Sequence, residues 1–192
     1  MDSSDASARA AILKAANFAA VKHKDQRSNE DETIPFINHP LGTADTLANI
    51  GKVQNPEVLQ AALLHDTVEW ADATFEELEA EFGRGVADLV REVTPAERGG
   101  NFQKPPEKTI LSTSAKEIML ADHLWYLTTL DQKAKNLTDA EMARFRNAAL
   151  EIENYRGANE AIEKMLDRLF KQRNVVSPSA PKGRTFLGYK FL

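Results

Sequence analysis

The sequence predicts an all-α protein, because helix-start signals recur along the chain and no segment alternates apolar and polar residues clearly enough to indicate a sheet. Between these signals, apolar residues recur at intervals of three or four, as on one face of a helix. Three of the start signals fit a capping box, in which a Ser or Thr is followed three positions later by Glu: Thr74 with Glu77, Ser114 with Glu117, and Thr138 with Glu141.

The 192 residues suit one domain, which we expect over residues 1–173, followed by a tail at 174–192. With 42% hydrophobic and 28% charged residues, the chain has the balance of a globular protein that buries a core. It has no cysteine, which excludes disulfides, zinc–thiolate sites and thiol nucleophiles. Any bound metal ion must therefore take its ligands from His, Asp, Glu or backbone oxygen.

Charge and hydropathy indicate a cytoplasmic protein. The segment MDSSDASARAAILKAA lacks the basic and apolar regions of a signal peptide, and no stretch reaches the roughly 18 apolar residues of a membrane span. The net charge of −5 disfavours a nucleic-acid surface, since a phosphate backbone requires an excess of Lys and Arg. We therefore expect no membrane or nucleic-acid partner, whereas a small anionic ligand and a homo-oligomer stay open.

The first half of the chain divides into helices and one loop. Residues 8–23 carry an apolar face, and the polar stretch 24–36 that follows is expected to be a loop. Pro40 suits the first turn of a new helix through LGTADTLANI. The motif NPE at 55–57 combines a capping side chain, a proline at the first helical position and an acid near the positive end of the helix. The helix that begins there carries VLQAALLHDTVEW.

The second half is also expected to be helical, apart from one long loop. Gly83 ends the helix that Thr74 begins, and an apolar stripe follows in the next one. Residues 94–113 contain Pro, Gly and Lys and are expected to form a basic loop. Three further helices are expected at about 114–131, 138–156 and 159–173. The tail is either disordered or an arm that docks its Phe, Tyr and Leu side chains on a neighbour.

Two adjacent residues in the apolar segment ALLHDTVEW, His65 and Asp66, are candidates for chemistry. Neighbours in a helix diverge by about 100° in direction, so a ligand shared by both must lie to one side of the helix. An imidazole with a carboxylate suits Mn²⁺, Fe²⁺ or Zn²⁺. The alternative is a chance pairing, but a charged pair in an apolar helix carries a desolvation cost and requires a partner.

Asp122 and His39 complete a set of two His and two Asp on three helical segments. Asp122 lies in the middle of EIMLADHLWYL, where Ile118 and Trp125 share its face, so its carboxylate is expected to point inward. An unpaired buried Asp is rarely tolerated, and a salt bridge to a buried Arg is the alternative to a metal ion. His39, in INHP, lies where a loop meets a helix, and alone it would be a cap or a surface histidine.

Six segments, taken in order, resemble the HD-domain small alarmone hydrolases, a family that includes the metazoan SpoT homologue and the hydrolase domain of RelA/SpoT proteins. They are AAVKHKDQR, PFINHPLGTA, VLQAALLHDTVE, LEAEFGRGVADLVREVT, LADHLWYL and LFKQR, and the resemblance runs from about residue 10 to residue 173. The resemblance implies an HD-domain helical bundle of about eight to ten helices.

The resemblance also implies a site and a reaction. One Mn²⁺ per chain would be bound by His39, His65, Asp66 and Asp122. The substrate would be the nucleotide guanosine 3′,5′-bis(diphosphate) (ppGpp), whose 3′-diphosphate is hydrolysed to give GDP and pyrophosphate. The metal would acidify and orient a water molecule, and a carboxylate would position that water or take its proton. Glu69 matches the family's acidic residue at this place, and its alternative is a solvated acid on the helix face.

Several positions depart from the family's pattern. The family's Asp after Glu69 is Trp70 here, and a tryptophan cannot accept a proton and would narrow the site. At other nucleotide-contacting positions the chain has His123 for Lys, Tyr126 for Asn, Phe36 for Tyr, and Ser28-Asn29 for a basic pair. The resemblance is therefore compatible with weak ppGpp hydrolysis, with action on another phosphorylated nucleotide such as NADPH, and with binding without turnover.

Other residues are candidates for substrate contact: Arg27, Phe36, Trp70, Lys104, Tyr126 and Arg144. Lys104 lies with Lys108 in the basic loop, where both could equally be solvated. Arg144 and Arg146 are two positions apart on a helix and therefore cannot both face one site. His23 is expected to be structural, and Trp125 and Phe145 are expected to belong to the core rather than to stack on a base.

Overall fold

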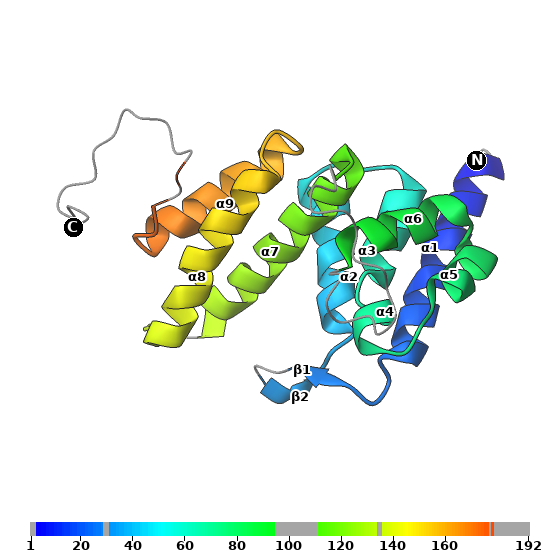
Figure 1. Cartoon of the computed structure of the whole chain (residues 1–192), viewed down its shortest axis with the longest axis horizontal. Helices are drawn as coiled ribbons and strands as arrows, with labels where there is room; N and C mark the ends of the chain where they lie inside the picture. The colour runs from blue at the N-terminus through cyan, green and yellow to red at the C-terminus, as the bar shows by residue number, and fades with distance from the viewer. Residues whose placement is uncertain (1–2, 29–30, 95–110, 134–135, 177, 179–192) are drawn as a thin grey trace.

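The structure is a computed structural model that describes residues 3–28, 31–94, 111–133, 136–176 and 178. Helices dominate it (Figure 1). Along the chain, the elements are α1 (Ser3–Lys22), β1 (Arg27–Ser28), β2 (Asp31–Pro35), α2 (Asn38–Asp45), the π-helical turn η1 (Thr46–Ile50), α3 (Pro56–Leu64), α4 (Thr67–Trp70), α5 (Phe75–Phe82), α6 (Arg84–Val93), α7 (Thr113–Lys133), α8 (Asp139–Glu151), the 3-10 turn η2 (Ile152–Asn154) and α9 (Glu160–Gln172). The expectation of an all-α fold is confirmed.

The expectation that residues 24–36 form only a loop and that the chain has no sheet is wrong. β1 and β2 form a small antiparallel sheet, with Arg27 opposite Pro35 and Ser28 opposite Asp31. No side chain of β2 is fully buried, so the strand lacks the alternation of a strand that has one face in the core. The hairpin forms without the apolar signal on which the sequence prediction relied.

Helix α3 lies at the centre of the bundle. Every side chain from Val58 to Leu64 is buried, and the helix contacts α1, α2, α6 and α7. A helix surrounded by others is apolar on all sides, which explains the nearly continuous apolar run in the sequence. His65 and Asp66 follow its last residue, so this buried helix fixes the position of the pair.

Helix α7 connects the two sides of the molecule. It packs on α2, α3 and α6 on one side and on α8 and α9 on the other. In Figure 1, α8 and α9 lie beside α7 and away from α1 and α5. Ile118, Leu124 and Leu127 are buried along it. Asp122 therefore projects from a helix that is held on both sides.

Three of the predicted helix starts are confirmed and one is wrong. Asn55 caps α3, Thr74 caps α5, and Thr138 forms a complete capping box with Glu141. Ser114, however, does not cap α7: the helix already includes Thr113, and the Ser112 hydroxyl accepts the Ala115 N–H at 3.1 Å. Ser112 and Ser114 both lie near this helix start, and the Ser-x-x-Glu pattern predicted Ser114, which lies inside the helix.

Some expectations fall on parts of the chain outside the described residues: Asn29, Lys104, Lys108 and the tail from residue 179. Val175 is buried against the core, two positions beyond residue 173, where the sequence placed the end of the domain. Among the helices of the described residues, none combines the length and the apolar character needed to cross a membrane.

Candidate functional site

His65 and Asp66 lie at a break between two helices rather than inside one, which corrects the expectation of a continuous helix. α3 ends at Leu64 and α4 begins at Thr67. The Thr67 hydroxyl donates to the Leu64 carbonyl at 2.7 Å, which satisfies one of the carbonyls that the end of α3 leaves unpaired. Both residues keep right-handed helical torsion angles, φ −57° and ψ −33° for His65 and φ −93° and ψ −6° for Asp66. Their side chains still meet to one side of the chain, where Asp66 Oδ2 lies 3.4 Å from His65 Nε2.

The tautomer of His65 is fixed by its own helix. Its Nδ1–H donates to the Ala62 carbonyl at 2.8 Å, and the residue is buried. In the neutral ring the proton is then on Nδ1, and the Nε2 lone pair points away from α3. Metal-binding imidazoles are usually oriented in this way, by a backbone carbonyl that accepts a hydrogen bond from the ring nitrogen that does not bind the metal.

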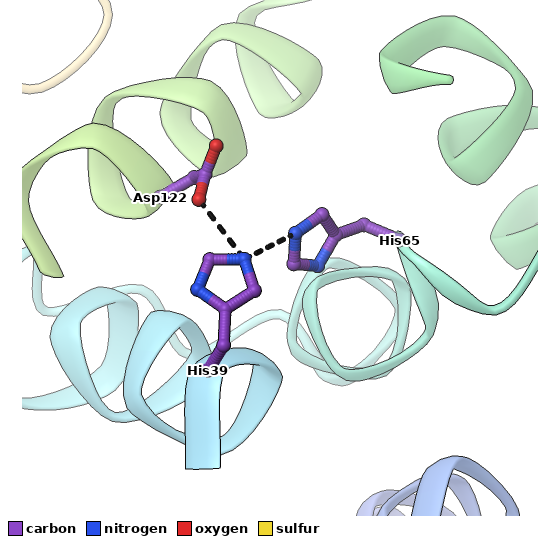
Figure 2. A group of neighbouring side chains, drawn as sticks. All are labelled: His39, His65 and Asp122. Atoms are coloured by element: carbon purple, nitrogen blue, oxygen red, sulfur yellow. Dashed lines mark hydrogen bonds and ion pairs between the residues drawn. The ribbon is translucent and has the colours of Figure 1, made fainter. Parts of the chain in front are cut away.

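Four side chains from three regions of the chain converge on one another, and Figure 2 shows three of them, His39, His65 and Asp122. His39 Nε2 lies 3.1 Å from His65 Nε2. The same nitrogen lies 3.2 Å from Asp66 Oδ2 and 3.2 Å from Asp122 Oδ1. His39 comes from the first turn of α2 and Asp122 from the middle of α7. The inward orientation expected for Asp122 is confirmed.

The donor set fits a divalent cation. One ligand atom each from His39, His65 and Asp122 lies within 4.8 Å of the others, and Asp66 Oδ2 lies 3.4 Å from His65 Nε2. Nitrogen and oxygen ligands about 2.0–2.2 Å from a single ion are themselves about 3.0–3.6 Å apart, whether the site is octahedral or tetrahedral. The spacings of His39 Nε2 from His65, Asp66 and Asp122 lie in this range, as does that of Asp66 from His65. His39, His65 and Asp122 form the compact group, and Asp66 adjoins it through His39 and His65.

Burial and hydrogen bonding set the protonation of this cluster. Burial alone would lower the pKa of His39, but hydrogen bonds with Asp122 and Asp66 outweigh it and raise the pKa to about 10. Burial would raise the pKa of Asp122, but the hydrogen bond with His39 outweighs it and lowers that pKa. For Asp66, burial is likewise outweighed, chiefly by the charge of His65, so its pKa is also lowered. Two carboxylates around one imidazole favour a positive charge between them.

A pocket of about 810 Å³ opens beside these residues, within the size range of small-ligand sites. His39, Asp66 and Asp122 are exposed to it. Of the residues predicted to contact substrate, five line this pocket: Arg27, Phe36, Trp70, Tyr126 and Arg144. Arg146 does not line it, which agrees with the prediction that Arg144 and Arg146 cannot both face one site. Glu69 lies half-buried on α4 and is not among the lining residues.

Trp125 is part of the pocket wall, whereas the sequence placed it in the core; Phe145 is fully buried, as expected. The Trp125 ring centroid lies 4.9 Å from that of His39. A Cβ atom on Gly42 would lie 1.6 Å from Trp125 Nε1, so the indole packs directly on the backbone of α2. This contact between residues far apart in the chain leaves no local signal in either segment.

His23 has the structural role that the sequence predicted. It is buried, its Nδ1 lies 2.6 Å from Gln26 Oε1, and burial lowers its pKa. The Gln26 amide in turn donates to the Trp70 carbonyl. This chain of contacts ties the start of the hairpin to α4 and sets one wall of the pocket. Gln26 is a lining residue that the sequence reasoning missed.

His123, beside Asp122, is paired with a residue that the sequence did not indicate. Its Nδ1–H donates to the Met119 carbonyl at 2.8 Å and its Nε2 lies 3.0 Å from Glu151 Oε2. Burial would lower the pKa of His123, but the Glu151 hydrogen bond outweighs it and raises that pKa. The Glu151 contact therefore favours the protonated form of His123, at the position where the resemblance expects Lys.

Comparison with known proteins agrees with this geometry. The family model described as HD domain matches residues 15–152. The chain is 42% identical over 177 residues to the guanosine-3′,5′-bis(diphosphate) 3′-pyrophosphohydrolase MESH1 of Danio rerio, covering 88% of this chain and 97% of that protein. The human protein of the same name is 38% identical over 172 residues, with 86% and 96% covered. A solved structure of a metazoan orthologue of SpoT that hydrolyses ppGpp superposes with a TM-score of 0.75 at 34% identity, covering 87% of this chain and 97% of that one.

Proposed function

The chain belongs to the HD-domain family of metal-dependent phosphohydrolases, and from this membership we propose that it hydrolyses ppGpp to GDP and pyrophosphate with Mn²⁺. The observation that carries the proposal is the meeting of His39, His65 and Asp122 within 4.8 Å beside the pocket. The names of relatives that match this chain over nearly their whole length support the choice of substrate.

We propose that His39, His65, Asp66 and Asp122 hold one ion per chain. When bound, the ion supplies a water molecule of lowered pKa and neutralises charge that develops on the phosphate. The Ala62 carbonyl holds the His65 ring with Nε2 toward the ion. Asp66 and Asp122 supply the negative charge that a divalent cation requires and that two neutral imidazoles lack.

In this proposal Glu69 positions the attacking water or accepts its proton. It lies on α4, three residues after Asp66, which is about one helical turn. Since its side chain is not among those lining the pocket, this role depends on its spacing from Asp66 and requires its own variant as a test.

The pocket offers separate surfaces for the parts of a nucleotide. Ile34, Pro35 and Phe36 form an apolar strip on the hairpin side, which suits a base. Trp125 on α7 adds an aromatic wall. Arg27 and Arg144 are cations at the lining of the pocket, where they suit phosphate groups. The substrate carries at least four negative charges and the chain has a net charge of −5, so binding requires a local group of cations such as these two arginines.

The direct test is release of pyrophosphate from ppGpp by the purified protein, with and without Mn²⁺. We expect release that depends on the metal and yields GDP. A panel that includes NADPH and other phosphorylated nucleotides identifies the preferred substrate. Absence of any release from a folded protein that contains stoichiometric metal would contradict the proposed activity.

A second candidate function follows from Trp70. This residue is 45% exposed and lines the pocket at the position where the resemblance expects a catalytic Asp. An indole there removes a carboxylate and takes up space next to Asp66. The same scaffold would then act on another nucleotide, for example as a phosphatase of NADPH, or bind a nucleotide without turnover. The nucleotide panel separates these cases, because binding without turnover leaves metal content and affinity intact while product formation is absent.

A further inference from the structure

A second polar cluster borders the pocket next to the proposed ion site. Arg144 Nη1 donates a 2.6 Å hydrogen bond to Tyr126 Oη. Tyr126 comes from α7 and Arg144 from α8, and both line the pocket together with Asp122. The bond therefore attaches a cation from an outer helix to the wall that also carries a proposed metal ligand.

The chemistry of this pair suits an anion. A guanidinium presents planar N–H donors whose spacing matches the oxygens of a phosphate group. The bond to Tyr126 limits the orientations of the Arg144 side chain, which lowers the entropy that a ligand must remove on binding. Asp66 and Asp122 also line the pocket, so a ligand that carries more than one phosphate gains from a cation on the far side of these carboxylates.

Arg27, the other arginine of the pocket, is directed toward its own loop. Its Nη1 donates to the Lys24 carbonyl at 3.3 Å and to the Gln26 carbonyl at 2.9 Å. These contacts stabilise the entry to the hairpin. Arg144 is instead bonded to Tyr126 of α7, which places its guanidinium on the α7 side of the pocket.

The spacing suits one nucleoside that has phosphate groups on both sides of its ribose. Asp122 and Tyr126 are four residues apart on α7, a rise of about 6 Å. With the 3′-phosphate at the ion site, the ribose can extend along α7 and bring its 5′ side toward Arg144. The base then has the apolar strip Ile34–Phe36 on the hairpin side.

We infer, on the basis of the proposed function, that Tyr126 and Arg144 form a second anion subsite that selects nucleosides phosphorylated on the 5′ side in addition to the 3′ group that is hydrolysed. Arg144 contacts the 5′-phosphate, and Tyr126 positions Arg144. The pair thus determines which nucleotides the pocket accepts and takes no part in the attack on phosphorus.

The test compares Arg144→Ala and Tyr126→Phe with Arg146→Ala, a matched control that removes the same charge from α8 but does not line the pocket. Each protein is assayed with ppGpp and with guanosine 3′-diphosphate, which lacks the 5′-phosphates. For ppGpp we expect Arg144→Ala to raise KM about 10- to 100-fold with little change in kcat, as loss of a charged hydrogen bond predicts. Tyr126→Phe should raise KM less, and Arg146→Ala should not raise it. In Arg144→Ala and Tyr126→Phe, the KM for guanosine 3′-diphosphate should change less than the KM for ppGpp.

A second readout needs no turnover. The two tryptophans of the chain, Trp70 and Trp125, both line the pocket, so intrinsic fluorescence reports on pocket occupancy. Titration with GDP should show weaker binding to Arg144→Ala than to the wild type or Arg146→Ala.

The two proposals fail in different ways. If Arg144→Ala weakens both substrates equally, or behaves as Arg146→Ala does, the subsite is wrong while hydrolysis of ppGpp stands. If the wild type hydrolyses neither substrate, the proposed function is wrong. In that case the GDP titration decides the subsite. If Arg144→Ala binds GDP more weakly than the wild type and Arg146→Ala do, the anion subsite is supported; if all three bind GDP equally, the subsite is wrong.

Discussion

The Nε2 atoms of His39 and His65 lie 3.1 Å apart, although the residues are 26 positions apart in the sequence and come from separate helical segments. Two carboxylate oxygens, one from Asp66 and one from Asp122, each lie 3.2 Å from His39 Nε2. Two imidazole nitrogens and two carboxylates directed at one another form a cluster that a cation stabilises. The first two predictions concern that cation.

Replacing a proposed ligand should remove the metal and the activity together. His65→Ala deletes a donor atom, and Asp66→Asn replaces a charged carboxylate by a neutral amide that binds a cation more weakly. Mn²⁺ content should therefore fall well below one per chain in both variants. The melting temperature should also lose its dependence on added Mn²⁺, because a bound ion stabilises the folded state by mass action. Asp88→Asn, at an exposed position on α6, is the control. Full metal content in either ligand variant, measured by elemental analysis, would exclude that residue as a ligand.

Metal binding should release a proton and become tighter as pH rises. With a pKa of about 10, the metal-free His39 carries a proton at neutral pH, and an imidazole must lose that proton to bind a metal. The apparent affinity for Mn²⁺ should therefore increase by up to about tenfold per pH unit between neutral pH and the pKa of His39. Calorimetry in buffers of different ionisation enthalpy measures the protons released. An affinity that does not change with pH would contradict this protonation state.

Glu69→Gln should reduce turnover and leave the metal in place. The amide has the shape of the carboxylate but cannot accept a proton, and loss of a general base typically lowers the rate about 10²- to 10⁴-fold. Metal content and KM should stay close to the wild type, since Glu69 is not a proposed ligand and does not line the pocket. The measurement is Mn²⁺-dependent pyrophosphate release at equal metal occupancy. A rate equal to that of the wild type would mean that Glu69 is an ordinary acid on the surface of α4.

Trp70→Asp should increase hydrolysis of ppGpp. The substitution supplies the carboxylate that the resemblance expects and opens space beside Asp66, since Trp70 lines the pocket. Trp70→Ala is the matched control, because it opens the same space without a carboxylate. We expect the rate of ppGpp hydrolysis to be highest in Trp70→Asp, lower in Trp70→Ala and lowest in the wild type. The gain in Trp70→Asp should be about tenfold, which is part of the 10²- to 10⁴-fold that a general acid or base typically contributes. Lower activity in a folded, metal-loaded Trp70→Asp would indicate that Trp70 serves a different nucleotide.

Gly42→Ala should destabilise the protein and weaken metal binding. The new methyl would lie 1.6 Å from Trp125 Nε1 and 2.1 Å from Cδ1, so the indole must move, at a cost of about 1–3 kcal/mol. Because Trp125 also packs on His39, Mn²⁺ affinity should fall as well.

The matched control for Gly42→Ala is Gly85→Ala on α6, where the added methyl meets the flexible end of Glu57 at 2.9 Å. That side chain can rotate away, and Ala favours helix over Gly by about 1 kcal/mol, so stability should be close to the wild type or higher. Thermal unfolding and metal titration of both variants check the pair. Equal stability of the two variants would contradict the packing argument.

Local rules explain why the helices could be predicted from the sequence. A cap or an apolar stripe involves residues three or four positions apart, so Asn55, Thr74 and Thr138 were correctly assigned as helix starts. The same rule was wrong at Ser114, because Ser112, two positions earlier, supplies the cap. The hairpin was missed because the side chains of β2 do not alternate between core and solvent. Local rules therefore fail where two nearby residues could each cap the same helix, or where neither face of a strand is buried in the core.

The sequence by itself determined the all-α class, because caps and apolar stripes are local patterns. It also proposed four residues to hold an ion, through the resemblance of its motifs to those of the HD-domain alarmone hydrolases. Only the tertiary structure decided how they meet. It brings His39 of α2 and Asp122 of α7 to the His65–Asp66 pair, and it packs Trp125 on Gly42 beside His39. It also brings Arg144 to the pocket that Tyr126 lines. These relationships join segments far apart in the chain, and their geometry is fixed by the packing of α2, α7 and α8 rather than by any local pattern.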